Sequence, residues 1–182
     1  MLANESGLLV CLLNRWHEER EELANPARSR GQLVMKMGGL ENVPAAEERL
    51  RGEDLGGLRP FTLMAFDSVG ERGWDWNGKC LEAARLEMPM CSSSFHFEEV
   101  AAARRLRYQE LACARATGRH LLESYHADAE GGASAFTVRM CRSDAQTMSR
   151  SRVRVVNGGV QWWYWEEQGE LASEPVLYEV SL

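Results

Sequence analysis

The spacing of apolar residues changes along this 182-residue chain, and that change constrains the fold more than any other feature of the sequence. Both ends carry short apolar or alternating runs, which are typical of strands. From Phe97 onward, in the middle of the chain, apolar residues recur at the three- and four-residue spacing of a helix face. Strands at both ends with helices grouped between them predict an α+β fold with layered antiparallel sheets.

The first half of the chain predicts three strands and two helices. Ser29 is a good helix cap, and Pro44 suits the first turn of a second helix. A turn at Gly70 separates two strand-like runs and predicts a hairpin. The predicted elements are, in order, strand 7–16, helix 31–37, helix 45–51, strand 60–67 and strand 74–76. The polar segment before Ser29, with Asn25-Pro26, predicts a loop.

The second half predicts two helices followed by strands. The longer helix begins at Phe97 and ends near Thr117-Gly118. Its apolar stripe comprises Val100, Ala103, Leu106, Leu111 and Ala114. The remaining predicted elements are helix 119–126 and strands 135–142, 149–156, 160–166 and 176–181, with Asn157-Gly158-Gly159 as a tight hairpin. Because side chains alternate along a strand, Trp163 and Trp165 are expected to share one face.

Composition bounds the classes of protein to which the chain can belong. Charged residues make up 26% and hydrophobic residues 45%, which is close to the soluble globular average and favours a single folded domain over residues 1–182. We find no linker, repeat or low-complexity tract. The net charge of -6 opposes binding to a nucleic-acid backbone, so no nucleic-acid partner is expected.

Cysteine usage and hydropathy predict where the protein resides. The five cysteines are odd in number and never spaced as CxxC, which favours a reducing compartment over a disulfide framework or a zinc cluster. No apolar run approaches the ~20 residues that span a bilayer, and no signal-peptide pattern begins the sequence. We therefore expect a cytoplasmic protein with no membrane span.

Several short segments, in order along the chain, resemble the NRDE family of transport and Golgi organisation proteins. The run ending in Asn14 is similar to that family's strand ending in "TN", and RSRGQLV is similar to its "SRGELV" turn into a helix. FTLMAFD resembles the family's "FNLIAAD" strand, and MCSSS takes the place of its "YGLSN" stretch. The segments 136–142, 147–156 and 160–165 resemble its closing "VCVRC", "TRT" and "IILV" strands.

The resemblance implies a fold and a chemistry. The family is similar to N-terminal nucleophile hydrolases, in which two stacked antiparallel sheets lie between helical layers (αββα) and a catalytic cysteine stands at the processed N-terminus. In such enzymes the free α-amine can activate the adjacent thiol. Position 2 of this sequence is Leu2, and the family's Asn-Arg-Asp-Glu motif is absent. The expectation is a domain incomplete at its N-terminus, missing the first strands and the nucleophile region.

The same resemblance suggests residues of a cleft. Asn14 matches an asparagine that helps to form the oxyanion hole in related hydrolases, a role that needs a donor aimed at developing negative charge. The family's "SN" asparagine falls on Ser93 or Ser94, and the arginine of "TRT" falls near Ser149, with Arg150 one residue further on. His126 and Ser134 lie near a strand expected to line the cleft. A small ligand in this cleft is therefore expected, although its identity is not.

Other reactive side chains have simpler explanations. Cys11 and Cys141 lie in apolar strand-like runs, where a cysteine is usually a small buried hydrophobe. Cys91 lies beside three serines at an expected helix start, which favours a thiolate, but Ser93 or Ser94 is better explained as a helix cap. The histidines show no metal-binding spacing, so no metal or resident cofactor is expected. The family resemblance alone implies haem as a cargo.

These observations leave three hypotheses. The first is a non-catalytic or truncated NRDE-type domain with a binding or transport role. The second is an active hydrolase of amide (C–N) bonds whose natural start, with a cysteine nucleophile, lies upstream. The third is a partner-binding module that completes its sheet with another chain, including a homo-oligomer through an open sheet edge.

Overall fold

A computed structural model provides the structure, and it describes residues 1–15, 28–114, 118–156, 159–168, 171–172 and 174–181. The chain divides into two compact units. Unit 1 comprises Met1–Leu86, Arg152–Trp163 and Leu177–Leu182, and unit 2 comprises Glu87–Ser151 and Tyr164–Val176. We describe each unit separately. That the whole chain forms one domain stays a prediction.

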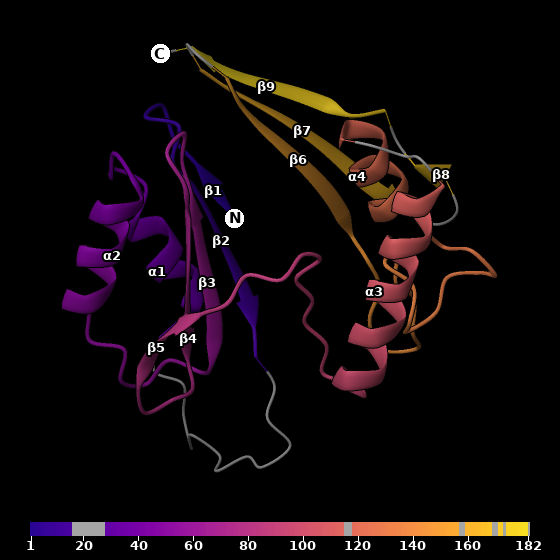
Figure 1. Ribbon diagram of the computed structural model, residues 1–182, viewed down its shortest axis with the longest axis horizontal. Coiled ribbons are helices and arrows are strands. Elements are labelled where there is room, and N and C mark those ends of the chain that lie inside the picture. Colours follow the sequence, from indigo (N-terminus) through magenta and orange to yellow (C-terminus); the bar gives the residue numbers. More distant parts are fainter. Residues whose placement is uncertain (16–27, 115–117, 157–158, 169–170, 173, 182) are drawn as a thin grey trace. The chain divides into compact units, whose positions relative to one another are not determined.

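A five-stranded antiparallel sheet forms the centre of unit 1 (Figure 1). Its strands are β1 (Leu2–Ala3), β2 (Leu9–Asn14), β3 (Phe61–Phe66), β4 (Glu71–Trp76) and β5 (Leu81–Ala84), and they are neighbours in that order. The β3–β4 hairpin pairs Leu63 with Trp74, as the turn at Gly70 predicted. The two strands β1 and β5 were not predicted, because runs of two and four residues carry too little pattern.

Two helices cover one face of this sheet, α1 (Arg30–Lys36) and α2 (Val43–Gly52) (Figure 1). Ser29 caps α1 by accepting a hydrogen bond from Gly31 N, and Asn42 caps α2 by accepting one from Ala45 N. Both helices were predicted to within two residues of these bounds. Alternate strand residues pack against them and form the core of unit 1, which includes Phe61, Leu63, Ala65, Trp74 and Trp76.

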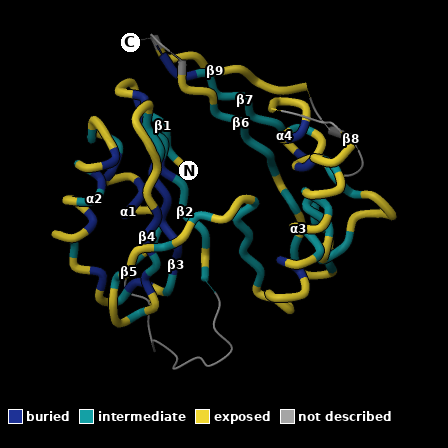
Figure 2. Tube along the Cα trace, viewed as in Figure 1, coloured by how far each residue is buried: buried dark blue, intermediate teal, exposed yellow. Residues whose placement is uncertain are grey.

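The buried side chains of the described structure are concentrated in this unit (Figure 2). Asn4, which is 8% exposed, ties the turn after β1 to the segment between the helices. Its amide donates to Gly38 O at 3.0 Å and Leu40 O at 2.7 Å, and its Oδ1 accepts from Leu8 N at 3.0 Å. One polar side chain thus satisfies three backbone groups that β-pairing leaves unpaired.

The two remaining helices and most of the irregular chain belong to unit 2. They are α3 (Phe97–Cys113) and α4 (Gly118–His126), which pack against each other through Tyr108 and Tyr125 at 5.3 Å between ring centroids. α3 ends before the predicted bound, and residues 115–117 lie outside the described residues. The predicted apolar stripe is only partly buried: Val100 is inaccessible, whereas Leu106 is 57% exposed.

A second antiparallel sheet comprises β6 (Ser149–Val156), β7 (Gly159–Gln168), β8 (Leu171–Ala172) and β9 (Val176–Ser181). β7 pairs with the other three strands. Arg152 stacks on Trp163 at 3.7 Å and Arg150 on Trp165 at 5.2 Å from the ring centroids, which confirms that the two tryptophans share a face. Strands 149–156 and 176–181 were predicted with these bounds. The predicted turn at Asn157-Gly158 and the loop at Asn25-Pro26 lie outside the described residues.

The predicted strand 135–142 is wrong. This segment is irregular and carries one isolated bridge, between Cys141 and Gln146. The hydroxyl of Thr137 accepts from Ser134 N and donates to Arg139 O, and the Ser134 hydroxyl accepts from Phe136 N. Local side-chain bonds of this kind satisfy the backbone in turns and compete with strand pairing.

The structure thus confirms a mixed α+β protein with antiparallel sheets, and four helices lie within the described ranges. None of these helices combines the length and the apolar character that crossing a bilayer requires.

Candidate functional site

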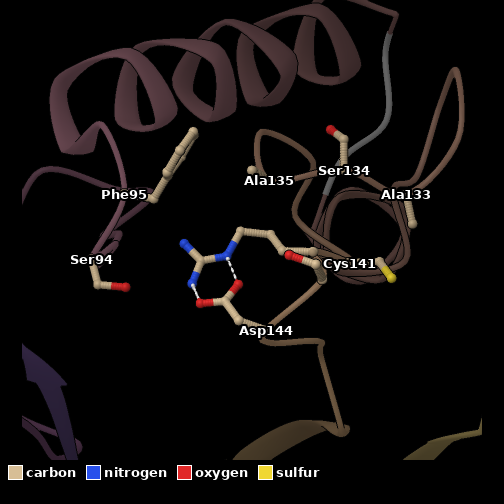
Figure 3. A pocket seen from close by; sticks show the side chains of 9 residues that line it. Ser94, Phe95, Ala133, Ser134, Ala135, Cys141 and Asp144 are labelled. Atoms are coloured by element: carbon tan, nitrogen blue, oxygen red, sulfur yellow. Dashed lines mark hydrogen bonds and ion pairs between the residues drawn. The ribbon is translucent and has the colours of Figure 1, made fainter.

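Unit 2 contains an open hollow with a volume of about 590 Å³, which lies within the usual range of small-molecule sites (Figure 3). One wall is the segment that enters α3, with Ser94 and Phe95, and the other is the irregular segment that carries Ser134 and Cys141 (Figure 3). Arg142 and Asp144 line it as well. Hydroxyls, an aromatic ring and a guanidinium therefore face the same space.

Phe95 provides the apolar surface of the hollow. Its ring is 39% exposed and meets the ring of Phe136 edge-on, with 6.2 Å between centroids. The guanidinium of Arg142 lies 5.5 Å from the Phe95 centroid, a distance at which the π-system attracts a cation. Phe95 therefore fixes one side of Arg142 and leaves part of its own ring open to a ligand.

Arg142 is the less exposed of the two charged side chains that line the hollow. Its side chain is 17% exposed and is held by Asp144, whose side chain is 68% exposed. Nε donates to Oδ1 at 2.9 Å, and one terminal nitrogen, Nη2, donates to Oδ2 at 2.8 Å (Figure 3). Such two-bond pairs match the planar guanidinium fork. The carboxylate therefore lies on the solvent side of the pair, and the cation lies inside.

Side chains of α3 hold the irregular wall in place. Arg107 binds Asp128 at 2.8 Å, where Asp128 is 8% exposed, and also contacts Glu110 at 3.2 Å. These acceptors, Asp128 first, raise the pKa of Arg107. Arg104 donates to Ala135 O at 3.4 Å, directly at the wall of the hollow. The hollow is thus supported from a regular helix, which is how loop sites in proteins are usually positioned.

The two predicted serines lie at or beside the hollow, but neither caps α3. The N-cap of α3 is His96, at φ 39°, with no side-chain cap bond. Ser93 instead closes a tight turn, because its hydroxyl donates to Phe95 O at 2.6 Å and accepts from Phe95 N at 3.1 Å. Ser94 is exposed and lines the hollow (Figure 3). The capping explanation is therefore wrong, and the role of Ser94 in a family cleft stays a prediction.

The other predicted site residues lie elsewhere. Asn14 is the last residue of β2 in unit 1, where it pairs with Phe61 and is exposed. Arg150 lies in unit 2 on β6, bound to the buried carboxylate of Glu167 and stacked on Trp165. Glu167 also meets Arg139 at 2.8 Å. Arg150 is thus placed as part of a buried ion cluster, and it does not line the hollow.

Of the other two residues expected near the cleft, Ser134 lies at the hollow and His126 does not line it. Ser134 lines the hollow, although the strand 135–142 that was expected to place it near a cleft is not formed (Figure 3). His126 ends α4, and desolvation followed by the charge of Arg150 lowers the pKa of its imidazole. A neutral imidazole does not repel the Arg150 cation, so it is compatible with the ion cluster around Glu167.

The cysteines occupy distinct surroundings. Cys11 lies in β2, and burial raises the pKa of its thiol, which disfavours the nucleophilic thiolate. Cys91 lies well before the first residue of α3, so the predicted helix-start position is wrong. It contacts Tyr125, where burial first, and then Cys91, raise the pKa of the phenol. Cys141 is exposed at the hollow rather than buried in a strand, so its predicted burial is also wrong.

That haem is carried as a cargo stays a prediction of the family resemblance. The structure, as far as it describes the chain, holds no group of three or more His, Cys, Asp or Glu side chains suited to a metal ion. The lining of the hollow offers Cys141 as the one side chain of an axial-ligand type. We derive no chemistry through either group.

The residues of the hollow that sequence reasoning missed include its aromatic and charged side chains, Phe95, Arg142 and Asp144. An Arg-x-Asp spacing in a polar segment carries no specific signal, because its meaning depends on a backbone bend. Arg142 N donates to Ala145 O at 2.7 Å and closes that bend. The neighbouring CSSSF segment was the signal that pointed toward the site.

Comparison with protein-family models, with curated proteins and with solved structures found no match for this chain.

Proposed function

We propose that this chain is a small-molecule-binding domain of the NRDE type, whose ligand occupies the hollow between the Ser94–Phe95 segment and the segment carrying Ser134 and Arg142. The observation that carries the proposal is the convergence of an exposed aromatic ring, hydroxyls and one inward guanidinium on a single open space. Binding sites typically combine apolar area with a few polar groups that set orientation.

Two of the candidate nucleophiles, Cys11 and Ser93, are poorly placed for catalysis at the hollow. The raised pKa of Cys11 keeps its thiol protonated near neutral pH, and its strand lies in the other unit. The Ser93 hydroxyl is engaged by the backbone of Phe95. The αββα arrangement and the NRDE relationship belong to this proposal, because they would make the hollow a family cleft adapted to binding.

A titration with a neutral aromatic probe tests the proposal. Benzamide added to the whole isotopically labelled chain should shift the backbone amide signals of Ser94, Phe95 and Ser134 in a saturable manner. Amides of the β3–β4 hairpin in unit 1 provide the internal control and should stay unchanged. Shifts that spread equally over both units, or that are absent with benzamide and with benzoate alike, would remove the hollow as a binding site.

A second candidate function rests on the edge of the first sheet. β1 pairs only with Leu9 and Val10, and among the strands the structure describes none pairs with the rest of β2 on that side. Arg15 N bonds Pro60 O on the β3 side and Leu8 O bonds Asn4 N on the β1 side. The backbone N–H and C=O groups of successive residues in a strand point alternately to its two sides. Those of Leu12 and Asn14 therefore point to the open edge. A β-strand of a second copy of this chain would complete it.

Proline substitutions in β2 test whether this edge pairs with a second copy of the chain. Asn14→Pro, at an exposed position, removes an N–H that faces the open edge, so the fold should survive while self-association is lost. Leu13→Pro removes an N–H directed at β3 and should destabilise the sheet, which makes it the matched control. Sedimentation velocity should show a concentration-dependent dimer for the unsubstituted chain. A strict monomer at every concentration would exclude pairing between copies.

A further inference from the structure

The ion pair at the hollow has a geometry that a ligand can copy. Asp144 occupies Nε and one terminal nitrogen of Arg142. The other terminal nitrogen makes no hydrogen bond to any residue that the structure describes. A guanidinium carries five N–H donors, so one face of the fork remains for a second acceptor. The group that already meets the fork is a carboxylate on a mostly exposed side chain.

We infer that the hollow takes a ligand with a carboxylate beside a flat apolar ring, and that Asp144 occupies the Arg142 guanidinium until such a ligand competes for it. The inference rests on the proposed function and names its ligand class. The carboxylate of the ligand binds Arg142, and its ring lies against the exposed part of Phe95. Ser94, at the same wall, is placed to donate a hydroxyl hydrogen bond.

Charge and exposure favour this assignment over a neutral or cationic ligand. Arg142 is the more buried partner of the pair, and a buried guanidinium strongly prefers a carboxylate partner. Asp144 can move toward water at little cost, because it is already 68% exposed. A cationic ligand would have to approach the buried guanidinium, where like charges repel. The site therefore selects anions, and Asp144 sets how tightly it binds them.

Binding of benzoate and of its neutral isostere benzamide to the whole chain tests the inference. Asp144→Asn removes the competing charge and should tighten benzoate binding about tenfold while leaving benzamide binding nearly unchanged. Arg142→Gln should weaken benzoate binding by at least about tenfold, and Arg142→Lys should retain part of it. Asp54→Asn, an exposed aspartate in unit 1, is the matched control and should change neither. Thermal unfolding verifies that each variant is folded.

The outcomes separate the inference from the proposed function. If benzamide shifts the amides of the hollow but Asp144→Asn leaves benzoate affinity unchanged or lowers it, the carboxylate assignment is wrong and the binding site stands. If neither probe shifts those amides in any variant, both proposals are wrong. If Arg142→Gln binds benzoate as well as the unsubstituted chain does, the guanidinium is not the anion receptor.

Discussion

The guanidinium of Arg142 meets both carboxylate oxygens of Asp144 across a bend of two residues, at 2.9 Å and 2.8 Å. The bend is closed by the Arg142 N to Ala145 O bond, and the wall behind it is tied to α3 through Arg104. Phe95 lies against the other side of the same guanidinium. A charged group is thus oriented by an irregular segment that is itself held by a helix.

The ion cluster of unit 2 should be a main determinant of its stability. Glu167 has a side chain that is 2% exposed and binds both Arg139 and Arg150. Glu167→Gln leaves the two guanidinium groups without their shared carboxylate, so the free energy of unfolding should fall by about 3 kcal/mol. Urea denaturation measures this change. Glu174→Gln, at an exposed position in the same unit, should cost less than about 0.5 kcal/mol; equal losses would contradict a buried cluster.

Asn4 should contribute more to the free energy of unfolding than Asn42, the residue that caps α2. Asn4→Ala leaves the Gly38 and Leu40 carbonyls and the Leu8 N–H without a partner near the core. We expect a loss of about 3 kcal/mol in the free energy of unfolding, because unsatisfied buried groups keep their desolvation cost. Asn42→Ala removes the exposed cap of α2 and should cost about 1 kcal/mol. The reverse order in denaturant unfolding would refute this role of Asn4.

Asp67 should make unit 1 sensitive to acid. Desolvation opposes ionisation, but bonds from the backbone N–H groups of Val43, Val69 and Gly70 outweigh it, so the pKa of Asp67 lies below its ordinary value. A carboxylate with a depressed folded-state pKa stabilises the fold above its unfolded pKa, near about 3.9. That contribution is lost as the pH falls through the lower folded-state pKa.

Paired unfolding measurements check this pH dependence. Asp67→Asn should lower the free energy of unfolding by about 2 kcal/mol at pH 7, and the difference from the unsubstituted chain should shrink as the pH falls below about 4. Glu48→Gln, at an exposed position on α2, should give a small difference at every pH. A difference for Asp67→Asn that does not change with pH would show that its charge is not what stabilises the turn.

Local signals explain why unit 1 was largely predictable from the sequence. Ser29 and Pro44 predicted the starts of the two helices, and the turn at Gly70 predicted the β3–β4 hairpin. These features depend on residues close in sequence, so patterns of caps and alternation reveal them. The two-residue strand β1 was not predicted, and an edge left open for another chain stays a hypothesis.

Unit 2 was less predictable because its structure depends on contacts distant in sequence. The segment 135–142 has the composition of a strand, but the Thr137 hydroxyl and the long-range Arg104 bond hold it in an irregular path. Arg142 was consequently assigned to a strand end, and its pairing with Asp144 was missed. Ser94 was named from the family resemblance and Ser134 from its closeness to a predicted strand, whereas Asn14 and Arg150 were carried over from the resemblance to positions away from the hollow.

Alkylation of Cys141 tests the central claim, that the hollow of unit 2 binds a small ligand, most directly. Cys141 is exposed at the hollow, and Cys80, which is exposed in unit 1, is the internal control. With benzamide at a concentration that saturates the amide shifts, reaction of Cys141 with iodoacetamide should slow several-fold, and the rate at Cys80 should stay constant. Equal rates at Cys141 with and without the probe, or equal slowing at both cysteines, would contradict the account.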